Sequence, residues 1–380
     1  MRLAALPFIL RYTILMTLCY YVTGHGYGHA IRSAQVLKAL PRDVPIILKT
    51  TAPERLFREE LGDRPFTYVR AEYDCGCIQP DSVTILKRET LDLYANIAAR
   101  NETVLADEAK FLQDRGVGVV VADIAPFPFE AAHVAGVPSI AASNFTWTDI
   151  YRAYAVTDAD RAMIAKMEAQ YALATVALVS DMYTPTTLAT FPNVEIAPLT
   201  CRIGTPSRPA LDRHLNALLA GTSAESAPHT GLLYMGTWGL EIGWENVEAL
   251  SDWRFVTYDP LDGPVANVAT LSRAEWNYAN TVASVDAMIS KIGYGTVSDC
   301  IGNSVPEVHL PRRDFVEYDA LVAGMDRWGG RVEMTEADFI AGKWGDALER
   351  ALRVQMRAVF RTDGAQFIAN RAVAMMRNNR

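Results

Sequence analysis

The sequence has few cysteines, and they lack the spacing that would mark a disulfide framework. Five among 380 residues is an odd number, so a small secreted fold held by disulfides is excluded and a reduced, cytoplasmic setting is expected. Cys75 and Cys77 form a close pair, but no second pair or adjacent histidine completes a metal-ligand set. The five are Cys19, Cys75, Cys77, Cys201 and Cys300.

A long apolar run is also missing. Residues 1–10 carry one arginine ahead of an apolar stretch and resemble a weak signal peptide, but Arg11 separates them from the next apolar run, 12–22. Neither run reaches the roughly 20 apolar residues that a membrane-spanning helix needs. We interpret 12–22 as a buried first strand and 1–11 as a candidate appendage, which leaves contact with a membrane surface open.

Basic residues are fewer than acidic residues in this sequence. Lysine and arginine number 36 against 44 aspartate and glutamate, which gives a formal charge of −8 and argues against nucleic acid as the main partner. An anionic ligand is not excluded, because a local cradle of backbone N–H groups can bind one against the overall field. The 50% apolar content supplies enough material for two hydrophobic cores.

Length and pattern predict two α/β domains that face a cleft. Apolar strand-like runs alternate with helical stripes in both halves, as in open parallel sheets with right-handed crossovers. The stretch 199–229 is rich in proline and glycine, which indicates a linker that holds one helical piece. We therefore expect domains at 1–198 and 230–360, followed by a final segment, 361–380. The expected strands are 12–22, 44–48, 117–122, 139–142, 231–236, 253–258, 287–290 and 307–310. The expected helices include 30–40, 90–112, 127–134, 211–219, 297–301, 345–360 and 365–377.

A turn rich in glycine and histidine follows the first predicted strand. Gly24, Gly26 and Gly28 allow the backbone to turn tightly and a second molecule to approach it closely. His25 and His29 are two of only six histidines in the chain. An imidazole at this edge of the sheet can take a proton from a hydroxyl group near neutral pH.

An acidic residue is expected at the same edge of the sheet. Asp123 directly follows the predicted strand 117–122, and a carboxylate that binds the far nitrogen of a histidine fixes its tautomer and stabilises the imidazolium. The spacing favours a dyad of Asp123 with His25 or His29. The alternative is that Asp123 caps the next helix and that the histidines only complete a turn.

The second half repeats the order of strand, glycine-rich turn and helix. Gly293 and Gly295 open the backbone, Thr296 can cap the helix or donate a hydroxyl, and Lys291 adds a positive charge. A helix N-terminus behind such a turn attracts phosphate, so this segment is a predicted anion site. The alternative is ordinary strand-to-helix turn chemistry.

Two further segments lie near the predicted anion site. Gly236 and Thr237, at the end of a strand, offer a second set of donors. Arg312, Arg313 and Asp314 follow the strand 307–310 and have the charges to contact phosphate and hydroxyl groups. A solvated charged loop is the alternative for the latter segment.

Together these segments resemble the nucleotide-sugar-dependent glycosyltransferases of the GT-B kind. The likeness rests on GHGYGHAIR at 24–32 and SKIGYGTVSD at 290–299, with support from VVVAD at 119–123 and SNFTW at 143–147. It is strongest toward the glycosyltransferase-like half of arabinokinases and covers residues 13–377, so it implies no sugar kinase activity. It implies two Rossmann-like domains and a C-terminal helix that crosses back to the first domain.

The resemblance assigns roles to individual residues. Gly28 and His29 match the pair that supplies the base for the acceptor hydroxyl, Asp123 completes the dyad, and His25 is an extra or a substitute. The turn of the second domain would bind the donor diphosphate through Gly293, Gly295 and Thr296. The donor sugar would meet Arg313, Asp314 and Glu317.

Two departures concern the nucleotide. Many members of the group carry histidine where this chain has Lys291, so the diphosphate would meet an ammonium group. The usual base-stacking residues are not evident, and Trp276 and Tyr278 are the candidates. Uridine is the first expectation, and thymidine and guanosine stay open.

The implied reaction is transfer of a hexosyl or pentosyl group from a nucleotide-diphosphate sugar to a hydroxyl group of a small-molecule or glycan acceptor by direct displacement. The helix N-terminus and Lys291 would neutralise the departing diphosphate, so we expect neither a metal ion nor a cofactor. The expected contacts to the acceptor are Gly28, Asn144 and Trp147. Asn144 and Trp147 belong to an aromatic segment that suits an acceptor or a core equally well. The alternatives are a nucleotide-sugar epimerase of the same fold and a non-catalytic nucleotide-sugar-binding protein.

Overall fold

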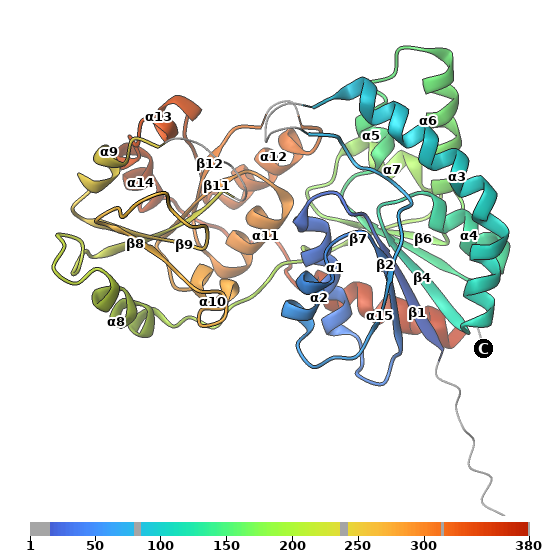
Figure 1. Cartoon of the computed structure of the whole chain (residues 1–380), viewed down its shortest axis with the longest axis horizontal. Coiled ribbons are helices and arrows are strands. Elements are labelled where there is room, and N and C mark those ends of the chain that lie inside the picture. Colours follow the sequence, from blue (N-terminus) through green and yellow to red (C-terminus); the bar gives the residue numbers. More distant parts are fainter. Residues whose placement is uncertain (1–15, 80–84, 236–241, 313–314, 379–380) are drawn as a thin grey trace, which may run out of the picture.

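The computed structural model describes residues 16–79, 85–235, 242–312 and 315–378. This part of the chain forms two α/β domains that lie side by side, each built on one parallel sheet (Figure 1). The predicted fold class is therefore confirmed.

The first sheet has seven strands. They are β1 (Thr17–Val22), β2 (Ile46–Thr50), β3 (Thr67–Arg70), β4 (Val117–Asp123), β5 (Ser139–Ser143), β6 (Val176–Ser180) and β7 (Val194–Ala197). Their order is β3-β2-β1-β4-β5-β6-β7, and every pair is parallel. Each residue of β4 is buried, because helices cover both faces of the sheet and leave no polar side to the strand.

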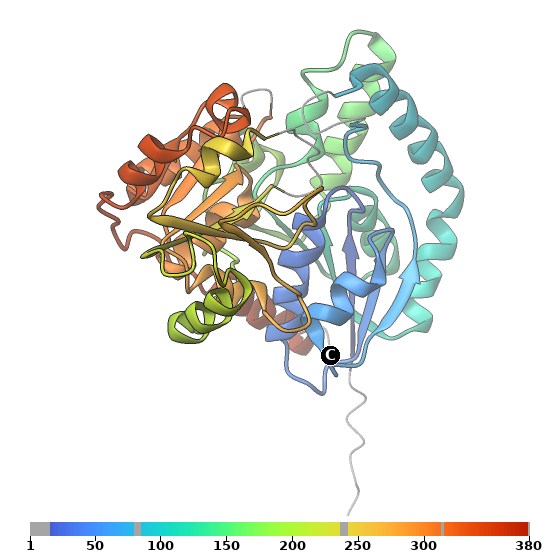
Figure 2. The ribbon, with the colours of Figure 1, turned by 60° about the vertical axis from the view of Figure 1, so that its left-hand side comes forward.

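The helices of this domain form two layers. They are α1 (Tyr27–Ala39), α2 (Glu54–Leu61), α3 (Lys87–Asp114), α4 (Phe127–Ala135), α5 (Trp147–Tyr151), α6 (Asp158–Tyr171), α7 (Pro185–Thr190) and α15 (Gly364–Asn378). Because successive strand side chains point to opposite faces, Leu18 and Tyr20 pack toward α1, α2 and α15. Cys19 and Tyr21 pack toward α3, α4 and α6. Figure 2 shows α3 along the outer side of this domain.

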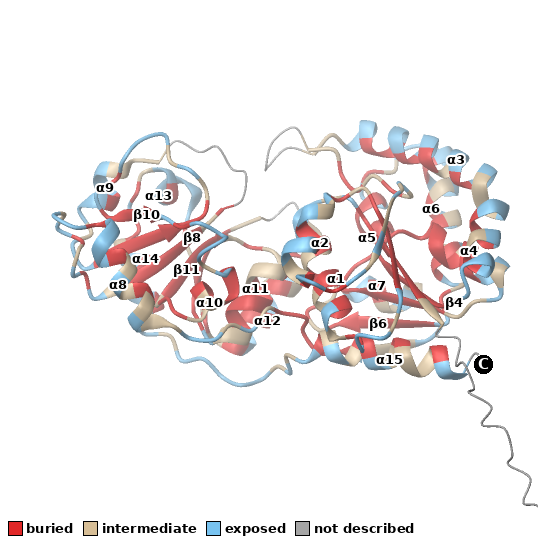
Figure 3. Cartoon of the chain, turned by 60° about the horizontal axis from the view of Figure 1, so that its bottom comes forward, coloured by how far each residue is buried: buried red, intermediate tan, exposed pale blue. Residues whose placement is uncertain are grey.

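The second sheet has six parallel strands. They are β8 (His229–Tyr234), β9 (Trp253–Thr257), β10 (Val268–Thr270), β11 (Ala287–Lys291), β12 (Glu307–Leu310) and β13 (Arg331–Glu333), in the order β10-β9-β8-β11-β12-β13. Its helices are α8 (Arg208–Leu218), α9 (Trp244–Glu248), α10 (Tyr278–Val282), α11 (Tyr294–Asn303), α12 (Tyr318–Trp328), α13 (Glu336–Ile340) and α14 (Gly345–Ala351). Figure 3 shows the strands of both sheets buried along most of their length.

Three details differ from the sequence-based expectations. Helix α1 begins at Tyr27, three residues early, because Gly26 at a φ of 68° makes the turn before it. The predicted helix 345–360 is wrong beyond Ala351: the chain turns back toward α12, where the Arg357 N–H donates to the Trp328 carbonyl at 2.7 Å. Within the predicted linker, α8 buries Leu211 and Leu215 in the core of the second domain.

The chain passes between the domains twice, and the two passages are joined. The Leu199 N–H donates to the Arg361 carbonyl and the Gly364 N–H donates to the Leu199 carbonyl, each at 3.0 Å. A Cβ on Gly364 would lie 2.2 Å from the Pro198 carbonyl oxygen, so the close approach of the two segments at this position requires glycine. Helix α15 then packs Ala369 and other apolar residues against the first domain, beside α1 (Figure 1).

The domains meet through α1 and α11 and through the segment after β12. Phe315 and Val316 of that segment pack against the core of the first domain. Among the described residues, none of the helices combines the length and the apolar character that crossing a bilayer requires.

Candidate active site

Both sheets reverse their strand order once, and these two points define the candidate site. The first sheet reverses between β1 and β4, and the second between β8 and β11. In open parallel sheets, ligands bind beyond the carboxyl ends of the strands at such a point. His29 follows β1, Asp123 ends β4, and Lys291 ends β11 ahead of the glycine-rich turn, so both predicted constellations lie at these points.

His29 and Asp123 form the predicted pair. The His29 Nδ1 lies 2.9 Å from the Asp123 Oδ1, and both side chains are largely buried. His29 projects from the first turn of α1 because that helix begins at Tyr27. Asp123 does not cap the following helix, α4, whose first turn has no side-chain cap. Of the two histidines that the spacing left open, His29 is the one that pairs with Asp123.

Arg32 is a third member of this cluster that the sequence analysis did not single out. Its Nε lies 2.6 Å from the Asp123 Oδ2 and its Nη2 lies 2.5 Å from the Oδ1, while the Ser33 hydroxyl donates to Oδ2 at 3.2 Å. Burial works to raise the pKa of Asp123, but the charges of Arg32 and His29 outweigh it and lower that pKa to about 2. Asp123 is therefore an ionised acceptor. The i, i+3 spacing, which places His29 and Arg32 on one face of a helix, is the sequence feature that could have identified Arg32.

His25 occupies a different environment. Its Nδ1 accepts a hydrogen bond from the Cys77 N–H at 3.3 Å, and its ring packs edge-on against Trp147. Burial, followed by the nearby charges of His29, Arg312 and Lys291, lowers the pKa of His25 to about 3. His25 stays neutral at working pH and has no contact with Asp123.

Two of the three candidate acceptor contacts of the first domain, Asn144 and Trp147, are fully buried. Trp147 has no exposed surface, and its Nε1 donates to the Asp74 Oδ2 at 2.8 Å. The Thr23 hydroxyl donates to the other oxygen of Asp74 at 2.7 Å. Burial raises the pKa of Asp74 to about 6. Asn144 is likewise buried, whereas Gly28 is exposed together with Gly24, Gly26 and Tyr27 of the same turn.

The glycine-rich turn of the second domain has the geometry of an anion cradle. Helix α11 begins at Tyr294, and the first N–H groups of a helix have no partner within it. A Cβ added to Gly293 or Gly295 would meet no other atom within 4 Å, so the space in front of the backbone is open. The Thr296 hydroxyl donates to the Gly293 carbonyl at 3.0 Å and thereby holds the turn.

Lys291 supplies charge to this cradle. Burial, and then the neighbouring charge of Arg312, lower the pKa of Lys291 to about 8. Arg312 lies over the Phe315 ring at 3.9 Å. Two cations close together in a largely buried place favour the binding of an anion.

Other predicted residues are placed differently. Glu317 reaches the first domain, where its Oε2 accepts a hydrogen bond from the Asn144 Nδ2 at 2.9 Å. Tyr278 is buried beneath Arg202, which lies 3.8 Å from its ring, whereas Trp276 stays half-buried. Four predicted donor contacts, Gly236, Thr237, Arg313 and Asp314, lie outside the described residues.

Comparison with solved structures gives the fold its name. CalG4, the calicheamicin glycosyltransferase, superposes with a TM-score of 0.56 at 17% identity, over 96% of this chain and 95% of its own. A UDP-glucosyltransferase from Polygonum tinctorium superposes with a TM-score of 0.59 at 14% identity, over 96% of this chain and 94% of its own. The chain has the GT-B fold.

One curated protein is similar to this chain in sequence. The L-arabinokinase of Arabidopsis thaliana is 28% identical over 351 residues, which is 90% of this chain and 32% of the kinase. This GT-B chain thus spans about a third of that relative's length. No protein-family profile matches the chain.

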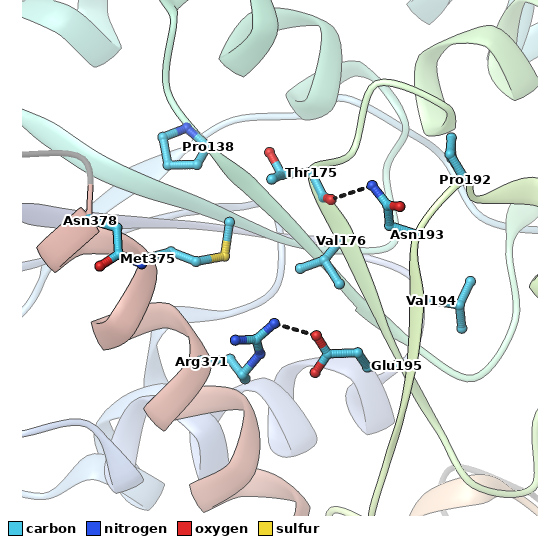
Figure 4. Close-up of a pocket in the computed structure, with 10 residues that line it drawn as sticks. All are labelled: Pro138, Thr175, Val176, Pro192, Asn193, Val194, Glu195, Arg371, Met375 and Asn378. Carbon is cyan, nitrogen blue, oxygen red and sulfur yellow. Dashed lines mark hydrogen bonds and ion pairs between the residues drawn. The ribbon is translucent and has the colours of Figure 1, made fainter.

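A hollow elsewhere on the GT-B chain lies at the opposite edge of the first sheet (Figure 4). It has a volume of about 790 Å³ and is lined by residues that precede or begin β5, β6 and β7, such as Pro138 and Val194, and by α15. Arg371 and Glu195 form an ion pair inside it. Because these are amino ends of strands, the hollow is separate from the candidate site.

Within the described ranges, no three His, Cys, Asp or Glu side chains of the GT-B chain gather closely enough to hold a metal ion. Independence of a metal remains a prediction.

Proposed function

We propose that the protein transfers a sugar from a UDP-sugar to the hydroxyl group of an acceptor. The observation that carries this proposal is the position of the His29–Asp123 pair at the switch point of one sheet and of the Lys291 cradle at the switch point of the other. The fold is that of glycosyltransferases, and one similar structure is a UDP-glucosyltransferase.

In the proposed reaction His29 removes the proton of the acceptor hydroxyl, and Asp123 stabilises the resulting imidazolium. The acceptor oxygen forms a bond to the anomeric carbon as the bond from that carbon to the diphosphate oxygen breaks. UDP leaves with the electron pair. The N-terminus of α11 and Lys291 stabilise the charge that develops on the diphosphate.

UDP binding is the first test. We expect UDP at a hundred times its dissociation constant to raise the free energy of unfolding by about 2.7 kcal/mol, visible as a higher melting temperature. Because the pKa of Lys291 lies near 8 in the protein without ligand, its ammonium form is present below pH 8 and lost above it. Affinity for UDP should therefore be level below pH 8 and fall above it, by up to about tenfold per pH unit.

Two variants test the role of Lys291 in UDP binding. Lys291→Met should weaken UDP binding and remove its pH dependence, whereas Lys343→Met, at an exposed lysine of the same domain, should change neither. A panel of UDP, TDP and GDP identifies the nucleotide, and release of UDP from UDP-sugars is then measured with and without acceptors. A protein that no nucleotide stabilises at millimolar concentration contradicts the proposal, and a UDP-sugar altered without an acceptor indicates an epimerase.

A side chain placed in the anion cradle should weaken UDP binding without lowering the stability of the free protein. Gly293→Val adds a side chain where a Cβ meets no other atom within 4 Å, and the φ of −165° suits a β-branched residue. We expect the melting temperature of the free protein to change little and UDP affinity to fall at least tenfold. Gly263→Val, also in open space, is the control and should affect neither quantity. Unchanged UDP affinity in Gly293→Val would place the diphosphate elsewhere.

A further inference from the structure

A continuous chain of hydrogen bonds connects the second domain to the predicted base. The Glu317 Oε2 accepts from the Asn144 Nδ2 at 2.9 Å, and the Asn144 Oδ1 accepts from the Arg32 Nη1 at 2.5 Å. Arg32 binds both oxygens of Asp123, which in turn binds His29. All five side chains are largely buried, so bulk water does not compete for these contacts.

Glu317 fixes the orientation of the Asn144 amide. A carboxylate can only accept a hydrogen bond from the Nδ2 group, and a guanidinium can only donate to the Oδ1 atom. With Glu317 on one side and Arg32 on the other, a single orientation of the amide satisfies both neighbours. Loss of the carboxylate would allow the amide to rotate and would leave the Arg32 Nη1 without this acceptor.

The position of Arg32 decides which nitrogen of His29 carries the proton. The Arg32 Nη2 lies 2.5 Å from the Asp123 Oδ1, 3.0 Å from the Ser143 Oγ and 3.0 Å from the His29 Nδ1. Nη2 has two hydrogens. When Asp123 and Ser143 accept both of them, the His29 Nδ1 is free to donate its own hydrogen to Asp123, and Nε2 remains the basic nitrogen. A displaced guanidinium would donate to Nδ1 and place the proton on Nε2.

A second contact from the donor side restrains the same guanidinium. The ring of Tyr294, the first residue of α11 and part of the anion cradle, lies 5.3 Å from the Arg32 guanidinium carbon. The Tyr294 hydroxyl accepts a hydrogen bond from the Thr200 N–H at 3.1 Å, which fixes the ring. Arg32 of the first domain is thus held by two residues of the second, Tyr294 directly and Glu317 through Asn144.

We propose that Arg32 is a positioning residue that sets the tautomer of His29, and that Glu317 holds Arg32 in place through Asn144. The basic form of His29 is then assembled only when the second domain is docked on the first. The inference rests on the proposed function for the role of His29 as a base. It gives Glu317 a place in this series of hydrogen bonds, in addition to the contact with the donor sugar that the sequence resemblance implied.

Ionisable groups from several elements act on His29. They are His25 from the turn before α1, Asp74 from the segment after β3 and Asp123 from β4. Among the described residues, only Asp123 and Arg32 lie within hydrogen-bond distance of the His29 ring. The position of the ring proton is therefore decided between these two neighbours.

NMR of ¹³C,¹⁵N-labelled histidine tests this inference without any substrate. The His29 signals are assigned by their loss in His29→Gln. In the wild type we expect neutral His29 to carry its proton on Nδ1. Glu317→Leu should convert a substantial fraction to the Nε2–H form, and Glu317→Gln, which keeps an acceptor for Asn144, should restore the wild-type tautomer.

Arg327→Gln is the matched control. It removes a different ion pair between the domains, the one that Arg327 forms with Asp181 at 3.1 Å. This pair is not part of the hydrogen bonds that lead from Glu317 to His29, so His29 should behave as in the wild type. A Glu317→Leu variant that keeps the wild-type tautomer overturns the inference. Because the measurement needs no donor, a protein that fails to bind UDP still gives a decisive answer.

Discussion

Replacement of His29 by alanine should lower sugar transfer by about 10²–10⁴-fold, the usual contribution of a positioned general base. The imidazole is paired with an ionised Asp123, and its removal leaves the acceptor hydroxyl without a group to take its proton. His29 is part of the first domain, whereas the anion cradle belongs to the second. UDP affinity should therefore stay within about twofold of the wild type, and the loss should appear in kcat.

His25→Ala is the matched comparison for this experiment. His25 belongs to the same turn but accepts a backbone hydrogen bond and has no contact with Asp123, so its loss should reduce transfer far less. A His25→Ala variant that loses transfer while His29→Ala retains it would reverse the assignment. If the wild type binds UDP-sugars and shows no turnover with any acceptor, and if His29→Ala binds them equally, the protein is a non-catalytic binder.

Asp123→Asn should cost the first domain about 3–5 kcal/mol of stability, because it leaves the buried Arg32 guanidinium without its counter-charge. For a domain of 150–250 residues this corresponds to a melting temperature lower by about 6–20 °C. The unfolding transition is measured by differential scanning calorimetry. Asp63→Asn, which removes the exposed partner of Arg42, should leave the melting temperature almost unchanged.

The pH dependence gives a second check on Asp123. Its pKa of about 2 lies below the ordinary value of about 3.9 for an unfolded chain. A carboxyl group with a depressed pKa contributes stability above pH 4 and loses that contribution as pH falls through 2. The difference between Asp123→Asn and the wild type should therefore shrink below pH 4. A difference that is small at pH 7 would show that Arg32 finds another partner.

The sequence allowed the two halves of the candidate site to be located because their signals are local. Strand, glycine-rich turn and helix are contiguous at 24–32 and at 290–299, and the carboxyl ends of parallel strands share one edge. Asp123 could be placed for the same reason, since it ends an apolar run. The choice between His25 and His29 stayed open in the sequence, because both lie in one turn and only packing against Cys77 and Asp123 distinguishes them.

The series of hydrogen bonds from Glu317 to Arg32 could not be predicted, because these bonds join residues that are far apart in the sequence. Asn144 and Glu317 are separated by 173 positions, and Arg32 and Asn144 by 112. No local periodicity encodes such contacts. The predicted helix 345–360 failed for a related reason: a hydrogen bond to Trp328 redirects the backbone after Ala351, and its partner lies on another helix.

The return of α15 to the first domain bears on the order in which the chain can fold during synthesis. Ile368, Ala369 and Ala372 complete a core that also contains Leu18 and Tyr20, so the hydrophobic layer begun by the first strand lacks its last side chains until the final helix has left the ribosome. The second domain has all of its own strands by Glu333. Although domains usually form in the order of synthesis, here the domain that starts first is finished last. Chains that stop before α15 would present an uncovered apolar face to chaperones and proteases.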